Sequence, residues 1–183
     1  MPTVSPVQNA DVQGAIARAA TRTGVDFDYL LAQARLESGL DPSAKAQTSS
    51  ASGLYQFIDS TWLRTLDRHG AKHGMDWADA AIAPNGRVAD TATRQQLLSL
   101  RYDADASSLM AAELTRENAA GLRSSLGRDA EPAELYLAHF LGLGGAQKFL
   151  GALGSNPDQS AAALMPQAAR ANRSIFYGGG SPR

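Results

Sequence analysis

The sequence predicts an all-α protein, and two observations carry that prediction. Long segments are filled by residues that favour helices, chiefly Ala, Leu, Gln, Glu and Arg, and they are separated by Gly, Pro and Asp. Runs of alternating β-branched residues, which are typical of strands, are missing. A chain of 183 residues with 44% hydrophobic residues can bury a substantial core. We therefore expect one globular, helical domain.

Apolar periodicity and breaker residues place the expected helices along the chain. Asp59 or Ser60 is a suitable N-cap for the third helix, and Pro132 falls in the first turn of a later one, where proline is tolerated. Two segments, 39–59 and 70–90, are irregular, and the first is rich in small and polar residues. The expected helices are, in order, 9–23, 26–38, 60–69, 91–101, 105–123, 131–141, 145–153 and 158–171.

The folded domain is expected over residues 11–177, between an N-terminal extension (1–10) and a flexible, glycine-rich tail (178–183). No signal peptide is visible at the N-terminus, and no stretch approaches the ~20 apolar residues of a membrane span. Lys and Arg total 17 against 18 Asp and Glu, without a basic cluster, so we expect no nucleic-acid partner. The absence of cysteine from the sequence excludes disulfides and cysteine-based metal sites.

The first candidate for chemistry is Glu37, near the end of the helix expected over 26–38. Glu37 and Ser38 fall at the two margins of an apolar stripe, and Gly39 and Pro42 stop the helix just beyond them. A carboxyl held partly toward the core, at the negative end of a helix dipole, keeps a proton available for a leaving group. The stripe consists of Phe27, Leu30, Leu31 and Ala34.

Position alone favours a plainer interpretation, in which Glu37 is a solvated helix-end residue paired with Arg35 or Lys45. The motifs that follow in the chain reverse this preference. The sequence reads Glu37-Ser38-Gly39, then Ser52-Gly53-Leu54-Tyr55-Gln56-Phe57, then Ser60-Thr61-Trp62. This order resembles the lytic transglycosylase domain of the soluble type, which has a catalytic Glu-Ser, a Gly-Leu-Met-Gln stretch and a Ser-Thr-Trp at very similar spacing.

A third motif of that family, Ala-Tyr-Asn-Ala-Gly, aligns with Ala138-His139-Phe140-Leu141-Gly142. The resemblance then extends from residue 11 to about residue 150. It implies an all-α, single-domain, lysozyme-like fold with a substrate groove, related to goose-type lysozyme. It also implies that peptidoglycan glycan strands are the substrate and that no cofactor is needed.

The implied reaction cuts the β-1,4 bond between MurNAc and GlcNAc with Glu37 alone. Glu37 first protonates the glycosidic oxygen, and the substrate's acetamido group stabilises the cationic centre. Glu37 then activates the MurNAc 6-hydroxyl, which gives a 1,6-anhydro end without water. Most glycosidases use two carboxylates, but the matched motifs contain no second one. Asp41 precedes Pro42 in a turn, and Asp59 is a natural N-cap.

Around Glu37, the first two motifs supply Ser38, Gly53, Tyr55 and Gln56 as candidate substrate-binding residues. Gly53 permits a positive φ or a close backbone approach, and Gln56 offers both donors and acceptors to an N-acetyl group or a hydroxyl. Tyr55 replaces the usual Met of the family and adds a hydroxyl. Aromatic faces at Tyr55, Phe57 and Trp62 suit sugar rings, although Phe57 and Trp62 fit a core equally well.

The third motif departs from the family pattern. His139 and Phe140 stand where the family has Tyr and Asn, so the contact expected from that Tyr is missing. Tyr136, one helical turn before Phe140, or the ring of His139 could supply it. We therefore include Tyr136, His139 and Phe140 among the candidate substrate-binding residues.

Two further patterns carry no separate function. His69 and His73 have the i, i+4 spacing of helical metal pairs, but Gly70 interrupts the helix and a third ligand is not evident, so we expect no metal site. The glycines from Gly142 to Gly145 follow a helix rather than a strand, which favours a tight turn between helices over a phosphate loop.

Two alternatives to a lytic transglycosylase stay open. One is a muramidase of the same fold that hydrolyses the same bond, and the other is a non-catalytic peptidoglycan-binding or assembly module. The substrate implies a periplasmic or secreted protein. The sequence leaves open flagellar assembly, secretion, phage entry or wall turnover as the context, and with it a protein partner in a secretion or flagellar assembly.

Overall fold

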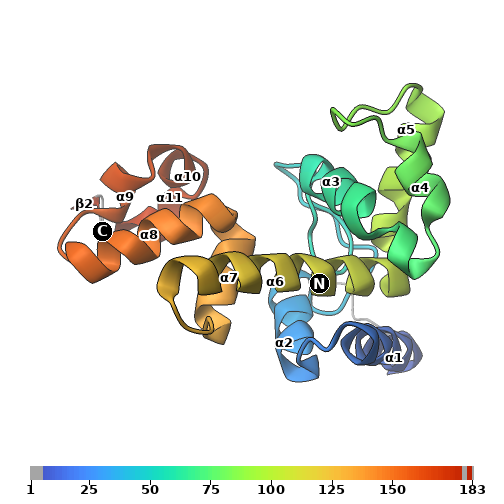
Figure 1. Cartoon of the computed structure of the whole chain (residues 1–183), viewed down its shortest axis with the longest axis horizontal. Coiled ribbons are helices and arrows are strands. Elements are labelled where there is room, and N and C mark those ends of the chain that lie inside the picture. Colours follow the sequence, from blue (N-terminus) through green and yellow to red (C-terminus); the bar gives the residue numbers. More distant parts are fainter. Residues whose placement is uncertain (1–5, 179–180, 183) are drawn as a thin grey trace. The chain divides into compact units, whose positions relative to one another are not determined.

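A computed structural model describes residues 6–178 and 181–182. These residues are predominantly helical, with one pair of two-residue strands near the C-terminus. The all-α class expected from the sequence is confirmed. The chain divides into two compact units, Met1–Arg116 and Glu117–Arg183, and the longest helix, α6 (Ala104–Leu126), contributes to both (Figure 1).

The first unit is built from α1, α2, α3, α4, α5 and the first half of α6. Helix α2 begins where the Asp26 side chain accepts a hydrogen bond from the Tyr29 N–H, and it ends at Gly39, whose φ of 65° is left-handed. The elements of the first unit that precede α6 are α1 (Pro6–Thr23), α2 (Phe27–Ser38), α3 (Asp59–His69), the 3-10 turn η1 (Ala71–His73), α4 (Asp76–Ala81), α5 (Thr91–Ser99) and the 3-10 turn η2 (Leu100–Tyr102).

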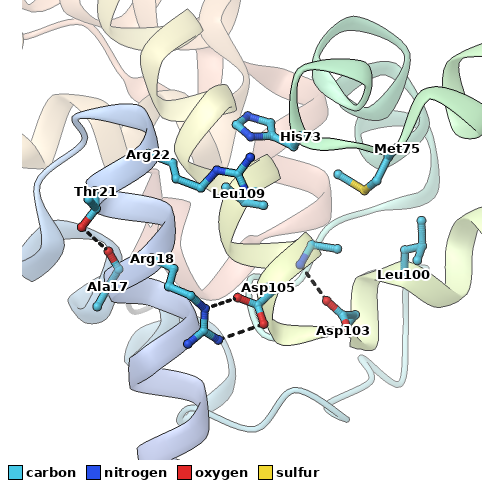
Figure 2. A pocket seen from close by; sticks show the side chains of 11 residues that line it. Ala17, Arg18, Thr21, Arg22, His73, Met75, Leu100, Asp103, Asp105 and Leu109 are labelled. Carbon is cyan, nitrogen blue, oxygen red and sulfur yellow. Dashed lines mark hydrogen bonds and ion pairs between the residues drawn. The ribbon is translucent and has the colours of Figure 1, made fainter.

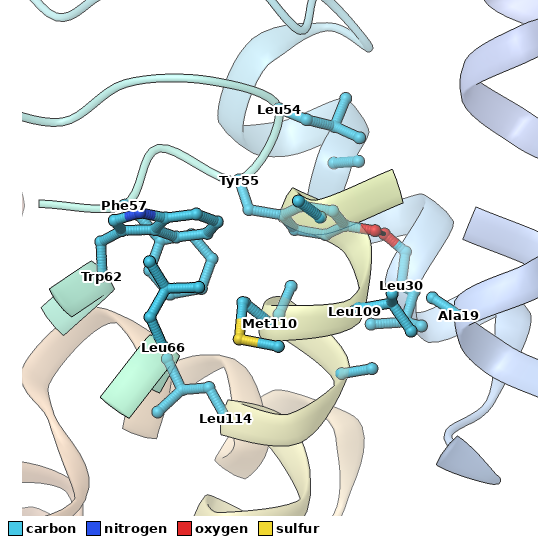
Figure 3. Close-up of a cluster of buried hydrophobic side chains, with 14 of the residues drawn as sticks. Ala19, Leu30, Leu54, Tyr55, Phe57, Trp62, Leu66, Leu109, Met110 and Leu114 are labelled. Atoms are coloured by element: carbon cyan, nitrogen blue, oxygen red, sulfur yellow. Dashed lines mark hydrogen bonds between the residues drawn. The ribbon is translucent and has the colours of Figure 1, made fainter. Parts of the chain in front are cut away.

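The core of this unit gathers around the first half of α6 (Figure 3). Met110 of α6 is fully buried beside the rings of Trp62 and Tyr55. Phe57 meets Trp62 edge-on at 5.1 Å between ring centroids, and the Trp62 indole N–H donates to the Leu97 carbonyl at 2.7 Å. Buried aromatics of this size, with their polar atoms satisfied, fix the segments that carry them in place.

The second unit contains the rest of α6 and the helices that follow it. Pro132 begins α7, and Glu131 and Glu134 form a capping box there, as the first-turn proline predicts. Gly142, with a φ of 73°, makes the expected tight turn into α8. The elements are α7 (Pro132–Leu141), α8 (Leu143–Ser155), α9 (Ala161–Leu164), α10 (Pro166–Ala171), α11 (Arg173–Phe176), β1 (Tyr177–Gly178) and β2 (Ser181–Pro182).

Several element boundaries differ from expectation for local reasons. The irregular segment 70–90 contains α4, a helix of 6 residues that is too short for apolar periodicity to reveal. The helix expected over 158–171 breaks at Pro166, which lacks an N–H and starts α10 instead. Asp59 does not cap α3: it is the first residue of that helix, and Ile58 occupies the N-cap position without a side-chain hydrogen bond.

Parts of the expected N-terminal extension and of the expected tail belong to regular secondary structure. Helix α1 already begins at Pro6, so only residues 1–5 of the expected extension fall outside the described residues. In the expected tail, Gly178 pairs with Ser181 in an antiparallel ladder, whereas Gly179, Gly180 and Arg183 lie outside the described residues. Among the described residues, no helix is both long enough and apolar enough to cross a membrane.

Candidate active site

Glu37 lies in the last turn of α2, where the helix emerges from the core. Leu30, Leu31 and Ala34 are buried along one side of α2, as the apolar stripe predicts, and Glu37 is half-buried one turn beyond Ala34. Leu36 beside it is 71% exposed. The candidate acid therefore stands at the edge of the core, next to an exposed leucine side chain.

Ser38 fastens this helix end to the second motif. Its hydroxyl lies 2.8 Å from the Leu54 carbonyl oxygen and 3.1 Å from that of Ala34, and its proton is donated to these two acceptors. We call residues 50–57 the site loop. Because the link comes from the residue directly after Glu37, the position of the carboxyl relative to the site loop is set by a hydrogen bond rather than by a long flexible connection.

Gly53 meets both of the requirements that the sequence suggested for it. Its φ is 79°, in the left-handed region, and a Cβ at this position would overlap the carbonyl oxygen of Arg101 and lie 2.7 Å from its carbonyl carbon. The Gly53 N–H donates to the Ala44 carbonyl at 2.8 Å. Only glycine allows the loop to press against the backbone at residue 101 in this way.

Gln56 is half-buried and holds a strained backbone position. Its φ is 48°, uncommon for a residue with a side chain. Its side-chain Nε2 donates to the Gly53 carbonyl at 2.9 Å and lies 3.3 Å from the Ala44 carbonyl. The amide N–H groups thus brace the loop from inside, which leaves the amide oxygen as the group suited to a substrate donor.

The expectation that the ring of Tyr55 faces a sugar is wrong. The Tyr55 side chain is fully buried, and its hydroxyl donates to the Leu30 carbonyl at 3.1 Å (Figure 3). Burial raises the pKa of this phenol well above its usual value, so it stays protonated. Phe57 and Trp62 are also core residues, at 2% and 0% exposure. The rings of Tyr55, Phe57 and Trp62 therefore support the site loop from the side of the core.

A buried arginine clamps the two ends of the site loop. The Nη1 of Arg101, in η2, donates to the carbonyls of Ser50 at 2.7 Å and Phe57 at 2.9 Å. The same nitrogen pairs with the Asp59 carboxylate at 2.9 Å, and the Arg101 residue is only 6% exposed. Buried charges persist where they are paired and hydrogen-bonded, and this one joins both ends of the loop to η2. Sequence reasoning missed Arg101, because its partners are mainly backbone carbonyls distant in sequence.

The two carboxylates that follow Glu37 in the chain are both engaged in local structure. One Asp41 carboxylate oxygen accepts from the Ser43 N–H at 2.8 Å and from the Ser43 hydroxyl at 2.6 Å, which closes an Asx turn. Asp59 pairs with Arg101 and, at 2.9 Å, with Arg94. Neither is poised as a second catalytic carboxylate, which agrees with a mechanism that relies on one Glu.

Residues 14–85 match the family model described as the transglycosylase SLT domain. The match supports a soluble lytic transglycosylase-type domain in this part of the chain. The match contains Glu37, the site loop and the Ser60-Thr61-Trp62 motif, and it ends before the third motif. It indicates an enzyme of peptidoglycan-related transglycosylase type with a lysozyme-like helical fold.

The third motif lies outside the matched residues, in the second unit, on α7. The rings of Tyr136 and His139 stack at 6.2 Å between centroids with an interplanar angle of 28°. Both side chains are half-buried, whereas Phe140 is 39% exposed. Tyr136 and His139 are therefore held as a pair on one side of α7, and their roles toward substrate stay predictions.

The two histidines considered as metal ligands lie beside the buried carboxylate of Glu113 instead. Glu113 of α6 is 3% exposed and lies 2.9 Å from His73 Nε2 and 3.7 Å from His69 Nδ1. Arg116 adds a contact at 3.3 Å. Within the described part of the chain, no group of His, Cys, Asp or Glu side chains is arranged to hold a metal ion.

Proposed function

We propose that this protein is a peptidoglycan lytic transglycosylase that cleaves the β-1,4 bond between MurNAc and GlcNAc and leaves a 1,6-anhydro-MurNAc end. One observation carries the proposal. Glu37 is half-buried at the end of α2, and Ser38 directly after it ties that end to the site loop at 2.8 Å. The SLT family match over residues 14–85 supports this assignment.

In the proposed first step, the Glu37 carboxyl gives its proton to the glycosidic oxygen as the bond from that oxygen to MurNAc C1 breaks. The acetamido group of the sugar stabilises the cationic centre at C1. In the second step, the Glu37 carboxylate takes the proton of the MurNAc 6-hydroxyl while its oxygen bonds to C1. Glu37 ends protonated, as it began, and no water is consumed.

For substrate binding, we propose the surface next to Glu37. Leu36 offers an exposed apolar contact, and the Gln56 amide oxygen is an acceptor for an N-acetyl N–H or a hydroxyl. Ser38 and Gly53 act by holding the site loop in shape. Tyr136, His139 and Phe140 are proposed as further substrate-binding residues from the alignment of the third motif. Such a substrate places the site of action outside the cytoplasm, in the periplasm or after secretion.

Replacing Glu37 by Gln tests the proposal, because it removes the proton donor and keeps the shape. We expect release of soluble muropeptides from purified sacculi to fall by about 10²–10⁴-fold, the range typical of a lost general acid–base, with the fold retained by circular dichroism. Asp28→Asn is the matched control, since Asp28 is an exposed carboxylate in the first turn of the same helix. Release at the wild-type rate from Glu37→Gln would refute the role of Glu37.

Mass spectrometry of the products separates the proposal from its alternatives. An anhydro end is lighter by one water than a hydrolysed reducing end, so products with reducing ends would make the protein a muramidase. Binding of sacculi by the wild type without any released muropeptide would make it a non-catalytic wall-binding module.

A further inference from the structure

A pocket of about 650 Å³ opens in the first unit (Figure 2), and its lining includes neither Glu37 nor a residue of the site loop. It lies between α1, the segment that follows α3, and the start of α6. Pockets of this size that are mostly apolar, with a few placed polar groups, are typical of small-molecule sites. The apolar part of its lining consists of Ala17, Met75, Leu100, Ala106 and Leu109.

Most of the charged side chains around this pocket already have partners, either another charged side chain or a backbone N–H. Arg18 and Asp105 form a bidentate pair at 2.7 and 2.9 Å, and Asp103 accepts the Ala106 N–H at 2.8 Å at the start of α6. Arg22 is different, since among the described residues no ion pair involves its guanidinium. Arg22 therefore leaves one positive charge available to a ligand, whereas the two carboxylates disfavour a ligand that carries several negative charges.

His73 supplies a second polar group that lacks a partner. Its side chain is 6% exposed and lines the pocket, toward which Arg22 extends (Figure 2). Nε2 lies 2.9 Å from the Glu113 carboxylate, whereas the buried Nδ1 has no hydrogen-bond partner. When Nε2–H donates to Glu113, Nδ1 of the neutral ring is an acceptor. A ligand N–H would satisfy it, and buried polar atoms without partners are rare enough to need an explanation.

We propose that this pocket binds an N-acylated apolar amino acid, either free or as the last residue of a peptide. The carboxylate of the ligand pairs with Arg22, its amide N–H donates to His73 Nδ1, and its side chain packs on Leu100 and Leu109. This binding site is separate from the proposed catalytic site and does not depend on its chemistry.

N-acetyl-L-leucine is a suitable probe, titrated into the full chain and followed by NMR chemical shifts or calorimetry. We expect saturable binding, with N-acetyl-L-leucinamide about tenfold weaker because it lacks the charge that pairs with Arg22. Arg22→Gln should weaken N-acetyl-L-leucine by a similar factor. Arg22 is exposed, so this variant is expected to fold normally. Arg64→Gln, which removes an exposed arginine of α3 outside the pocket, should bind like the wild type.

Three results would overturn the inference: no saturable binding of N-acetyl-L-leucine up to ~10 mM, equal binding of the neutral amide, or equal binding by Arg22→Gln. The Glu37→Gln variant should bind the probe as the wild type does. Muropeptide release therefore tests the proposed catalytic function, and probe binding tests this pocket. Failure of one proposal can be distinguished from failure of the other.

Discussion

At position 53 the backbone requires glycine for two reasons that can be separated by experiment. The φ of 79° disfavours any L side chain, and a Cβ would in addition overlap the carbonyl oxygen of Arg101. Gly24 has a nearly identical φ of 76°, but a Cβ there would meet nothing within 4 Å. The two glycines share the positive φ and differ in burial and in the close approach, so Gly24 serves as the reference for φ strain alone.

We expect Gly53→Ala to lower the free energy of unfolding by about 3 kcal/mol, because strain in φ adds to a backbone clash that cannot relax by moving a flexible side chain. Gly24→Ala should cost only about 1 kcal/mol, the strain alone. Urea unfolding of both variants at neutral pH measures the difference. If both variants lost the same free energy of unfolding, the close contact between Gly53 and Arg101 would not affect stability.

Single residues differ in how far their roles could be read from the sequence. The half-buried position of Glu37 and the need for glycine at position 53 could be predicted, because helix periodicity and glycine geometry are local properties. The burial of the Tyr55 ring could not, since the same aromatic type serves a core or a sugar-binding surface depending on which elements pack around it. The role of Arg101 could not be predicted for a related reason, because two backbone carbonyls and one carboxylate become its partners only after the chain folds.

At the scale of elements, the end of α2 and the site loop form one braced assembly. Within the residues that the structure describes, the non-glycine residues with positive φ are Leu40, at 67°, and Gln56, at 48°. One follows the helix end that carries Glu37, and the other lies in the site loop. Strained backbone of this kind costs roughly 1–3 kcal/mol per residue and persists where surrounding contacts impose it.

Arg101 provides such contacts, and its replacement should loosen the whole site loop. We expect Arg101→Leu to lower the free energy of unfolding by about 3–5 kcal/mol, because the Asp59 carboxylate and two loop carbonyls lose a buried partner. Arg101→Lys keeps the charge but not the planar geometry, so it should recover part of the stability while muropeptide release stays low. Urea unfolding and sacculus digestion measure the two effects.

Arg94→Gln is the control for Arg101, because Arg94 pairs with the other oxygen of Asp59 from a position that is 43% exposed. Its removal should cost no more than about 0.5 kcal/mol and should leave muropeptide release unchanged. If Arg101→Lys digested sacculi at the wild-type rate, the clamp would matter for folding alone and not for the geometry of the site.

The elements themselves show where sequence patterns fail. Long amphipathic helices such as α1, α2 and α6 lie close to their expected positions, since each carries several turns of apolar periodicity. The failures are α4, with 6 residues, and the break at Pro166 between α9 and α10. Short helices gain most of their stability from tertiary packing, which a local pattern does not contain.

At the scale of the whole molecule, each compact unit has its own apolar clusters and its own carboxylate with a lowered pKa. In the second unit, bidentate hydrogen bonds from Arg128, together with the Glu131 N–H, lower the pKa of Glu134 to about 2. This carboxylate is near the surface, where solvent and salt screen its contribution. In the first unit, which carries the candidate active site, the pKa of the exposed Asp90 is also lowered by hydrogen bonds at the start of α5, whereas the carboxyl with a lowered pKa that is buried is Glu113.

Burial acts to raise the pKa of Glu113, but the hydrogen bond to His73 and the charges of His69, Lys72 and Arg116 outweigh it and lower the pKa. A carboxyl with a lowered pKa in the folded state adds stability that is present above its unfolded value of 4.5 and is lost as pH falls through the folded value. The free energy of unfolding of the wild type should therefore decline between about pH 5 and pH 3.

Glu113→Gln removes this titration and the contacts of the Glu113 carboxylate with a charged partner together. At pH 7 we expect the variant to be less stable by about 2 kcal/mol, since His73 and Arg116 lose a charged partner. Below about pH 4.5 the difference should shrink, because the wild type then loses the same interactions by protonation. Urea unfolding at a series of pH values measures both slopes, with the exposed Asp79→Asn of α4 as the control that keeps the wild-type slope. If the difference in free energy of unfolding between the wild type and Glu113→Gln stayed constant down to pH 3, an ionised, buried Glu113 would not be the group that links η1 to α6.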